Sequence, residues 1–161
     1  MTIGAVFGAT KFLMSVHWRF SMKLGFLSKL FEGTLTIERT YNDCDRAIGK
    51  LRSYNEKLAK KERVPDKEKM ELDALVNRAI EGATKLVNLE PERNWPGVFR
   101  EMHKNLATIY LELDERDKVR DACEKLRGYG ETGRLDAAEV LQKLSDKEGG
   151  KVDATGKAVA G

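Results

Sequence analysis

The chain has 161 residues, 41% of them hydrophobic and 34% charged, with 29 Lys and Arg against 26 Asp and Glu. This length suits one domain. Its two cysteines are too few for a disulfide-stapled mini-protein, and its apolar content excludes wholesale disorder. Because Cys44 and Cys123 lie 79 residues apart and form no CxxC motif, we expect two reduced, buried thiols in a cytoplasmic protein.

Residues 1–33 form a basic and aromatic leader. Its first 31 residues contain four basic side chains and no acid, and they hold five of the six phenylalanines. On a helix, the apolar side chains cover one broad face opposite a narrow basic stripe. We expect this amphipathic helix to contact a membrane or a protein interface through Phe7, Lys11, Trp18, Arg19, Phe20, Lys23 and Phe26.

Two interpretations of the leader stay open. It is an interfacial helix on the anionic, inner face of a membrane, or a docking helix that packs on this chain or on a second copy. A transmembrane span is not supported, because only the first ten residues are free of charge and about 20 apolar ones are needed. A secretory signal fits poorly, since the basic residues are spread through the apolar run. Met22 is also a plausible start, with residues 1–21 as upstream sequence.

Residues 34–147 are expected to be helical, because glycines are rare up to Arg127 and no period-2 alternation persists. The first helix is predicted from about Thr36 to Arg63. Asn55 interrupts its apolar seam; a solvent-facing end position is favoured over a buried Asn that fixes register. The seam consists of Ile37, Tyr41, Cys44, Ile48, Leu51, Asn55 and Leu58.

Proline marks the next two boundaries. Pro65 breaks the first helix, and Asp66 is expected to cap a second, which stops before Pro91. Pro96 belongs in the first turn of the following helix. The expected inward faces are Met70, Leu72, Leu75, Val76, Ala79, Ile80, Ala83, Leu86 and Val87 on the second helix, and Val98, Phe99, Met102, Leu106, Ile109, Tyr110 and Leu113 on the third.

Two further helices are predicted before the end of the chain. Asp114 and Asp117 bracket a turn into a helix that Gly128, Gly130 and Gly133 end. Thr132 or Asp136 would cap the last helix. The inward sets are Val119, Ala122, Cys123 and Leu126, followed by Leu135, Ala138, Leu141 and Leu144. Residues 148–161 have no packing face and are expected to form a mobile tail.

Part of this pattern resembles a known family. Leu106-Ala107-x-x-Tyr110, followed by Val119, Cys123 and Leu126, resembles the two helices of a tetratricopeptide repeat. The second helix and closing proline of a preceding repeat are matched by Ala79, Ala83, Leu86 and Pro91. Tyr129-x-x-x-Gly133-Arg134-Leu135-Asp136-x-Ala138 resembles the family's inter-helix turn. Over residues 66–147 the resemblance implies a right-handed stack of antiparallel hairpins that binds peptides or helices and catalyses nothing. The whole chain is thus expected to be all-α, with about six helices including the leader.

No pattern predicts a catalytic, cofactor or metal site. His17 and His103 are not spaced with other ligands, and His103 follows an apolar helix face, so we expect a packed or boundary residue. No glycine pattern forms a phosphate-binding loop. Nucleic-acid binding is not favoured, because acids interrupt the best basic cluster, Lys57, Lys60, Lys61 and Arg63.

The sequence therefore favours a non-enzymatic scaffold module that binds a protein or peptide partner and is localised by its leader. The expected contact residues are Trp95, Phe99, Arg100 and Tyr110. The alternative is a structural subunit of a homo- or hetero-oligomer, in which the leader is the assembly interface.

Overall fold

The computed structural model describes residues 36–91 and 93–149. These residues form helices and connections without any strand, which confirms the all-α prediction. Contacts divide the chain into two units, Met1–Glu38 and Arg39–Gly161, and the following concerns the second. Its helices are residues 36–59, α2 (Asp66–Val87), α3 (Pro96–Glu112), α4 (Arg116–Arg127) and α5 (Gly130–Gly149). The predicted leader helix and residues 150–161 of the tail lie outside the described residues.

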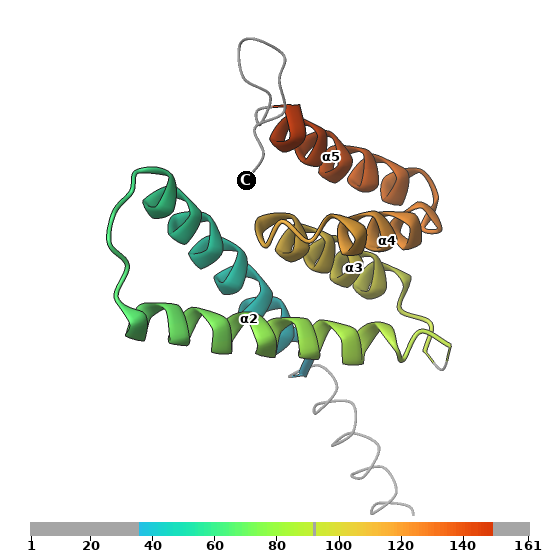
Figure 1. Cartoon of the computed structure of the whole chain (residues 1–161). Coiled ribbons are helices and arrows are strands. Elements are labelled where there is room, and N and C mark those ends of the chain that lie inside the picture. The colour runs from blue at the N-terminus through green and yellow to red at the C-terminus, as the bar shows by residue number, and fades with distance from the viewer. Residues whose placement is uncertain (1–35, 92, 150–161) are drawn as a thin grey trace, which may run out of the picture. The chain divides into compact units, whose positions relative to one another are not determined.

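Helix 36–59, α3 and α5 run in the same direction, while α2 and α4 run back (Figure 1). Helix 36–59 and α2 form an antiparallel hairpin in which Cys44 lies against the carbonyl of Ala79. α3 packs against α2, α4 and α5. Residues early in α3 contact early α5, and residues late in α3 contact late α5. We call helix 36–59, α3 and α5 the three-helix layer.

The first helix ends at residue 59, four residues before the predicted Arg63. Lys61 adopts a left-handed conformation with φ 56°. Its backbone N–H donates to the carbonyl of Leu58, and the N–H of Glu62 reaches the carbonyl of Lys57, both at 2.9 Å. This Schellman arrangement satisfies the terminal carbonyls and stops the helix before proline is reached. Sequence reasoning missed it because the left-handed residue is not glycine.

The α2 helix starts at Asp66, so this residue is the first helical residue and not the predicted cap. Met70 was placed on the wrong face: it is 71% exposed. Near the tip of the hairpin, α2 has no third helix to pack against. Leu58, on the other helix of the hairpin, is half exposed as well. The buried residues of α2 are Leu72, Leu75, Val76, Ala79, Ala83 and Leu86.

Pro96 occupies the first turn of α3, as predicted. Leu113 lies just past the end of this helix and is exposed, contrary to its predicted inward position. α4 buries the predicted set without exception: Val119, Ala122, Cys123 and Leu126. Asp114 has φ 59° and ends α3 by the same backbone pattern as Lys61.

The last helix departs most from the prediction. α5 begins at Gly130, so Gly133, Thr132 and Asp136 lie within it and neither terminate nor cap a helix. The segment that resembled an inter-helix turn is therefore helical. Of the predicted inward residues, Leu144 is buried, whereas Leu135 is 64% exposed and Ala138 is exposed too; the other buried residues of α5 are Gly133, Ala137 and Val140. The reason is steric: a Cβ on Gly133 would lie 2.1 Å from the carbonyl oxygen of Leu126, so only glycine permits this approach of α5 to α4.

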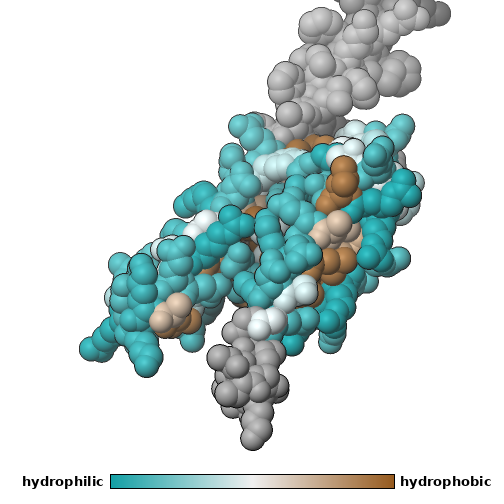
Figure 2. Space-filling view, turned by 90° about the horizontal axis from the view of Figure 1, so that it is seen from above, coloured by the Kyte–Doolittle hydropathy of each residue, from teal (hydrophilic) through white to brown (hydrophobic). Residues whose placement is uncertain are grey.

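The apolar core runs through the whole bundle. Phe99, Met102 and Ile109 of α3 are its largest fully buried side chains. A cluster joins α3, α4 and α5 and contains Ala107, Leu111, Val119, Ala122, Cys123, Leu126, Ala137, Val140 and Leu144. The surface in Figure 2 is largely hydrophilic, with only separate hydrophobic groups. The few exposed large apolar side chains of the described part are Leu58, Met70, Leu113 and Leu135.

Candidate interaction face

The exposed side of α3 lies between helix 36–59 and α5 and is entirely polar. Glu101, Lys104, Thr108 and Glu112 follow one another at intervals of three and four residues, which places them on one face. The Thr108 hydroxyl donates to the carbonyl of Lys104 within the helix. Lys104 and Glu112 connect α3 to its neighbours, while Glu101 pairs with Arg100 of the same helix.

Near the start of α3 the face is held by Asp136 of α5. The Lys104 ammonium donates to Asp136 at 2.7 Å, and the Arg100 guanidinium lies 3.5 Å from the second oxygen of the same carboxylate. Arg100 also pairs with Glu101, and Lys104 with Glu139 at 3.7 Å. The hydrogen bond to Asp136 raises the pKa of Lys104, so this cation stays charged at any physiological pH.

Near the end of α3 the face is held by Glu112. Its carboxylate accepts hydrogen bonds from Arg52 at 3.1 Å and from Asn55 at 3.3 Å, both on helix 36–59. From the other side, Lys147 of α5 donates to the carbonyl of Leu111 at 2.9 Å and lies 3.4 Å from Glu112. Cations at this position also offset the negative end of the α3 dipole. One carboxylate thus joins all three helices of the layer.

The two carboxylates at the centre of these contacts are nearly covered, whereas their partners are not. The side chains of Glu112 and Asp136 are 11% and 12% exposed. Four cations surround them, with exposures of 27% to 52%. We call these four the cation set: Arg52, Arg100, Lys104 and Lys147. The nearly covered acids therefore hold cations whose side chains are partly exposed to solvent.

The residues predicted to contact a partner do not form one site. Arg100 belongs to the cation set. Phe99 is 1% exposed and packs in the core, so it cannot reach a partner in this structure. Trp95 precedes α3 and is half-buried, with its ring 6.3 Å from that of Phe99 and under Arg93. Tyr110 is partly buried against the α3–α4–α5 cluster, with the Lys118 ammonium 5.2 Å from its ring centre.

The predicted membrane or interface residues of the leader all lie outside the described residues: Phe7, Lys11, Trp18, Arg19, Phe20, Lys23 and Phe26.

Sequence reasoning missed Arg52, Glu112, Asp136 and Lys147, because their contacts join residues 32 to 60 positions apart. Asn55 gave the one usable signal, since it interrupted an apolar seam. It does not occupy the favoured solvent-facing position: it is half-buried and donates to the backbone carbonyl of Glu112 at 2.9 Å.

The buried thiols expected from the sequence are confirmed. Cys44 and Cys123 are free and at most 1% exposed. Burial raises the pKa of Cys44 to about 12 and that of Cys123 to about 11, so both remain protonated and poorly nucleophilic at neutral pH. Within residues 36–91 and 93–149, no group of three or more His, Cys, Asp and Glu side chains is arranged to hold a metal ion.

No family model, curated protein or solved structure matches this chain. None of the helices within the described ranges combines the length and apolar character needed to cross a bilayer.

Proposed function

We propose that the chain is a non-enzymatic protein-interaction module that binds an acidic peptide or helix on the exposed face of the three-helix layer. The observation that carries this proposal is the burial difference between acids and cations. Glu112 and Asp136 fix the cation set in place, so a partner carboxylate meets donors that are already ordered. Charge-assisted hydrogen bonds of this kind are the strong ones, and prior ordering lowers the entropy cost of binding.

The fine architecture that we propose is a right-handed tetratricopeptide-like stack. Its support is the alternation of helix direction and the packing of Ala107 of α3 with Val119 and Cys123 of α4 in one cluster. In such a stack the three-helix layer forms one continuous surface. An extended or helical partner would cross helix 36–59, α3 and α5 in turn.

The leader, in this proposal, brings the cytoplasmic module to the inner face of an anionic membrane. Its support is the sequence pattern of five phenylalanines and four basic residues without an acid in residues 1–31. Co-sedimentation with anionic vesicles tests it: the full chain should pellet, and a chain lacking residues 1–31 should not. Pelleting of both chains would contradict a role for the leader.

Selection from a random peptide library tests the interaction face. Peptides selected on the full chain should be rich in Asp and Glu and should bind more weakly in high salt. The double variant Arg100→Gln/Lys104→Gln removes two members of the cation set. It should lower affinity for the selected peptides about tenfold, because two charge-assisted hydrogen bonds are lost.

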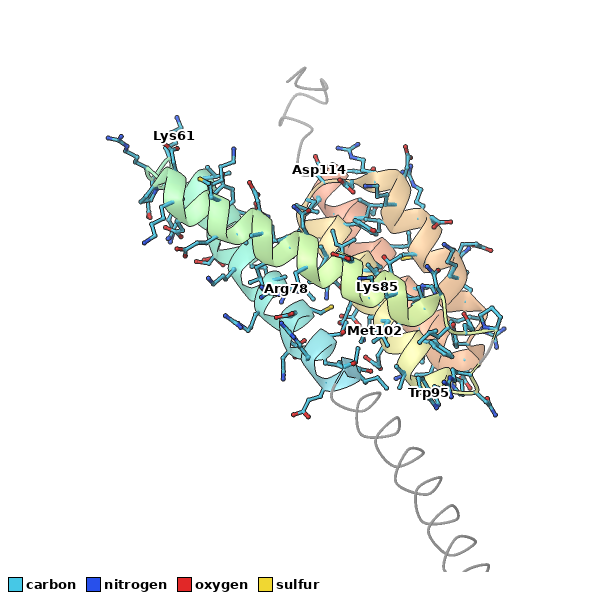
Figure 3. All side chains as sticks on the ribbon, turned by 90° about the horizontal axis from the view of Figure 1, so that it is seen from below. Lys61, Arg78, Lys85, Trp95, Met102 and Asp114 are labelled. Carbon is cyan, nitrogen blue, oxygen red and sulfur yellow. The ribbon has the colours of Figure 1, made fainter. Side chains whose placement is uncertain are left out.

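A double variant on α2 is the matched control: it changes the net charge equally, and it also removes a cation from a nearly covered carboxylate. Arg78 and Lys85 lie on α2 (Figure 3), and Arg78 pairs with Asp43, whose side chain is 11% exposed. Arg78→Gln/Lys85→Gln should retain affinity, and thermal melting checks that both variants fold. Selected peptides without acidic enrichment, or equal weakening by both double variants, would contradict the proposed face.

A further inference from the structure

A pocket of about 370 Å³ lies away from the interaction face, between the C-terminal ends of α2 and α4. α2 and α4 each pack on α3 but not on each other, so a gap is left between their ends. Asn88 and Glu90 line it from the α2 side, Gly128 and Tyr129 from the α4 side, and His103 from α3. Its volume falls at the lower end of the range for sites that bind small groups.

Two polar groups of the pocket, Glu90 and His103, face each other without forming a hydrogen bond to each other. The Tyr129 hydroxyl donates to one oxygen of Glu90 at 2.5 Å. The other oxygen faces Nε2 of His103 at 4.0 Å, which is too long for a hydrogen bond. His103 is 5% exposed, and within the described part of the chain its ring nitrogens form no hydrogen bond. A donor placed between these two atoms would satisfy both.

The charge of the pocket favours a cationic donor. Glu90 contributes a carboxylate, and the carbonyl ends of α2 and α4 add partial negative charge. Burial lowers the pKa of His103, so the imidazole is neutral at pH 7 and keeps an acceptor nitrogen. Among the described residues that line the pocket, the one cation is Lys125, which is bound to Asp121 of its own helix at 2.8 Å. The aromatic faces of His103 and Tyr129, 5.8 Å apart, complete an environment that attracts organic cations.

We propose that this pocket binds the guanidinium or ammonium group of an arginine or lysine side chain from a partner protein. Such groups carry several N–H donors and no acceptor, which matches the second carboxylate oxygen of Glu90 and the neutral imidazole of His103. The site is separate from the cation set and has the opposite charge preference. It would therefore recognise a different part of a partner.

Titration of the full chain with small capped amino acids tests the pocket. The probes are N-acetyl-arginine methylamide, N-acetyl-lysine methylamide and, as an uncharged isostere of arginine, N-acetyl-citrulline methylamide. NMR signals of the His103 ring and the Gly128 amide should shift saturably with at least one cationic probe and not with the citrulline probe.

The variant Glu90→Gln removes the charge but keeps an oxygen for the Tyr129 hydroxyl, and it should weaken binding of the cationic probe about tenfold. Glu71→Gln, on the far part of α2, is the matched control and should retain affinity. Three results would each overturn the proposal: no saturable shift with either cation, equal binding of citrulline, or unchanged affinity in Glu90→Gln.

Discussion

The α4–α5 corner and the hairpin of helix 36–59 and α2 reverse the chain by different physical means. At the corner, two helices approach so closely that the backbone of Gly133 lies against the Leu126 carbonyl, with no room for a side chain. In the hairpin, side chains such as Cys44 separate the helices, and a left-handed Lys61 ends the first of them. At the corner a Cβ would therefore meet backbone, whereas at Gly82, the tightest described glycine of the hairpin, it would meet only the Thr40 side chain, at 3.1 Å. Substitutions should affect the two regions in different ways.

The largest expected effect is at the corner. Gly133→Ala places a methyl group 2.1 Å from the Leu126 carbonyl oxygen and 2.9 Å from Cβ of Tyr129. It should lower the free energy of unfolding by roughly 3 kcal/mol, because the backbone of α4 cannot move aside cheaply. Urea denaturation measures the loss. The matched control is Gly49→Ala in helix 36–59, where an added Cβ meets no described atom within 4 Å; it should stabilise by about 0.5 to 1 kcal/mol. If both variants changed the free energy of unfolding equally, the close packing at Gly133 would not be the cause.

A smaller effect is expected where the hairpin joins α3. Asn55→Ala removes the hydrogen bonds to the carbonyl and carboxylate of Glu112 and should cost about 1 kcal/mol in the same denaturation assay. Asn42→Ala, at an exposed position of the same helix, gains the same helix propensity and loses no contact of this kind. The difference in unfolding free energy between the two variants measures the contribution of the hydrogen bonds between Asn55 and Glu112. If both variants unfold at the same urea concentration, the hydrogen bonds between Asn55 and Glu112 add nothing to stability.

The smallest expected effect is a gain at the hairpin tip. Lys61 has φ 56°, a conformation that costs a non-glycine residue about 1 kcal/mol. Lys61→Gly should recover most of this cost and raise the melting temperature by a few degrees. Lys60→Gly, one residue earlier and without a positive φ, should not stabilise. A lower melting temperature for Lys61→Gly would show that the lysine side chain matters more than its backbone strain.

The contrast also explains which elements could be predicted from the sequence. The inward face of α4 was correct because four apolar residues at helical spacing left no other choice. The inward face of α5 was predicted wrongly because Gly133 carries no apolar signal, although α4 lies so close that a Cβ there would meet the Leu126 carbonyl oxygen at 2.1 Å. Glycine was interpreted as a helix end, since it usually is one. The pattern of apolar side chains in a sequence cannot reveal that two helices approach each other at a residue without a side chain.

The polar sites were harder to predict for a related reason. Arg100 was among the predicted contact residues, but the residue that holds it, Asp136, lies 36 positions later, on another helix. Glu90 and His103 are 13 positions apart and looked unrelated, and Tyr129, which fixes Glu90, is 39 positions from it. Such pairs become visible only after helix direction and packing are known. The sequence indicates each charge, while the fold decides which charges meet.

The position of Glu112 couples binding of a partner on one side of the three-helix layer to contacts on the other side. This carboxylate is shared between Arg52 on one outer helix and Lys147 on the other. A ligand that withdraws either cation leaves the carboxylate to the remaining cation and to Asn55. Binding of a ligand at one outer helix of the layer would thus strengthen the ion pair between Glu112 and the other outer helix. This is a thermodynamic linkage carried by a single side chain.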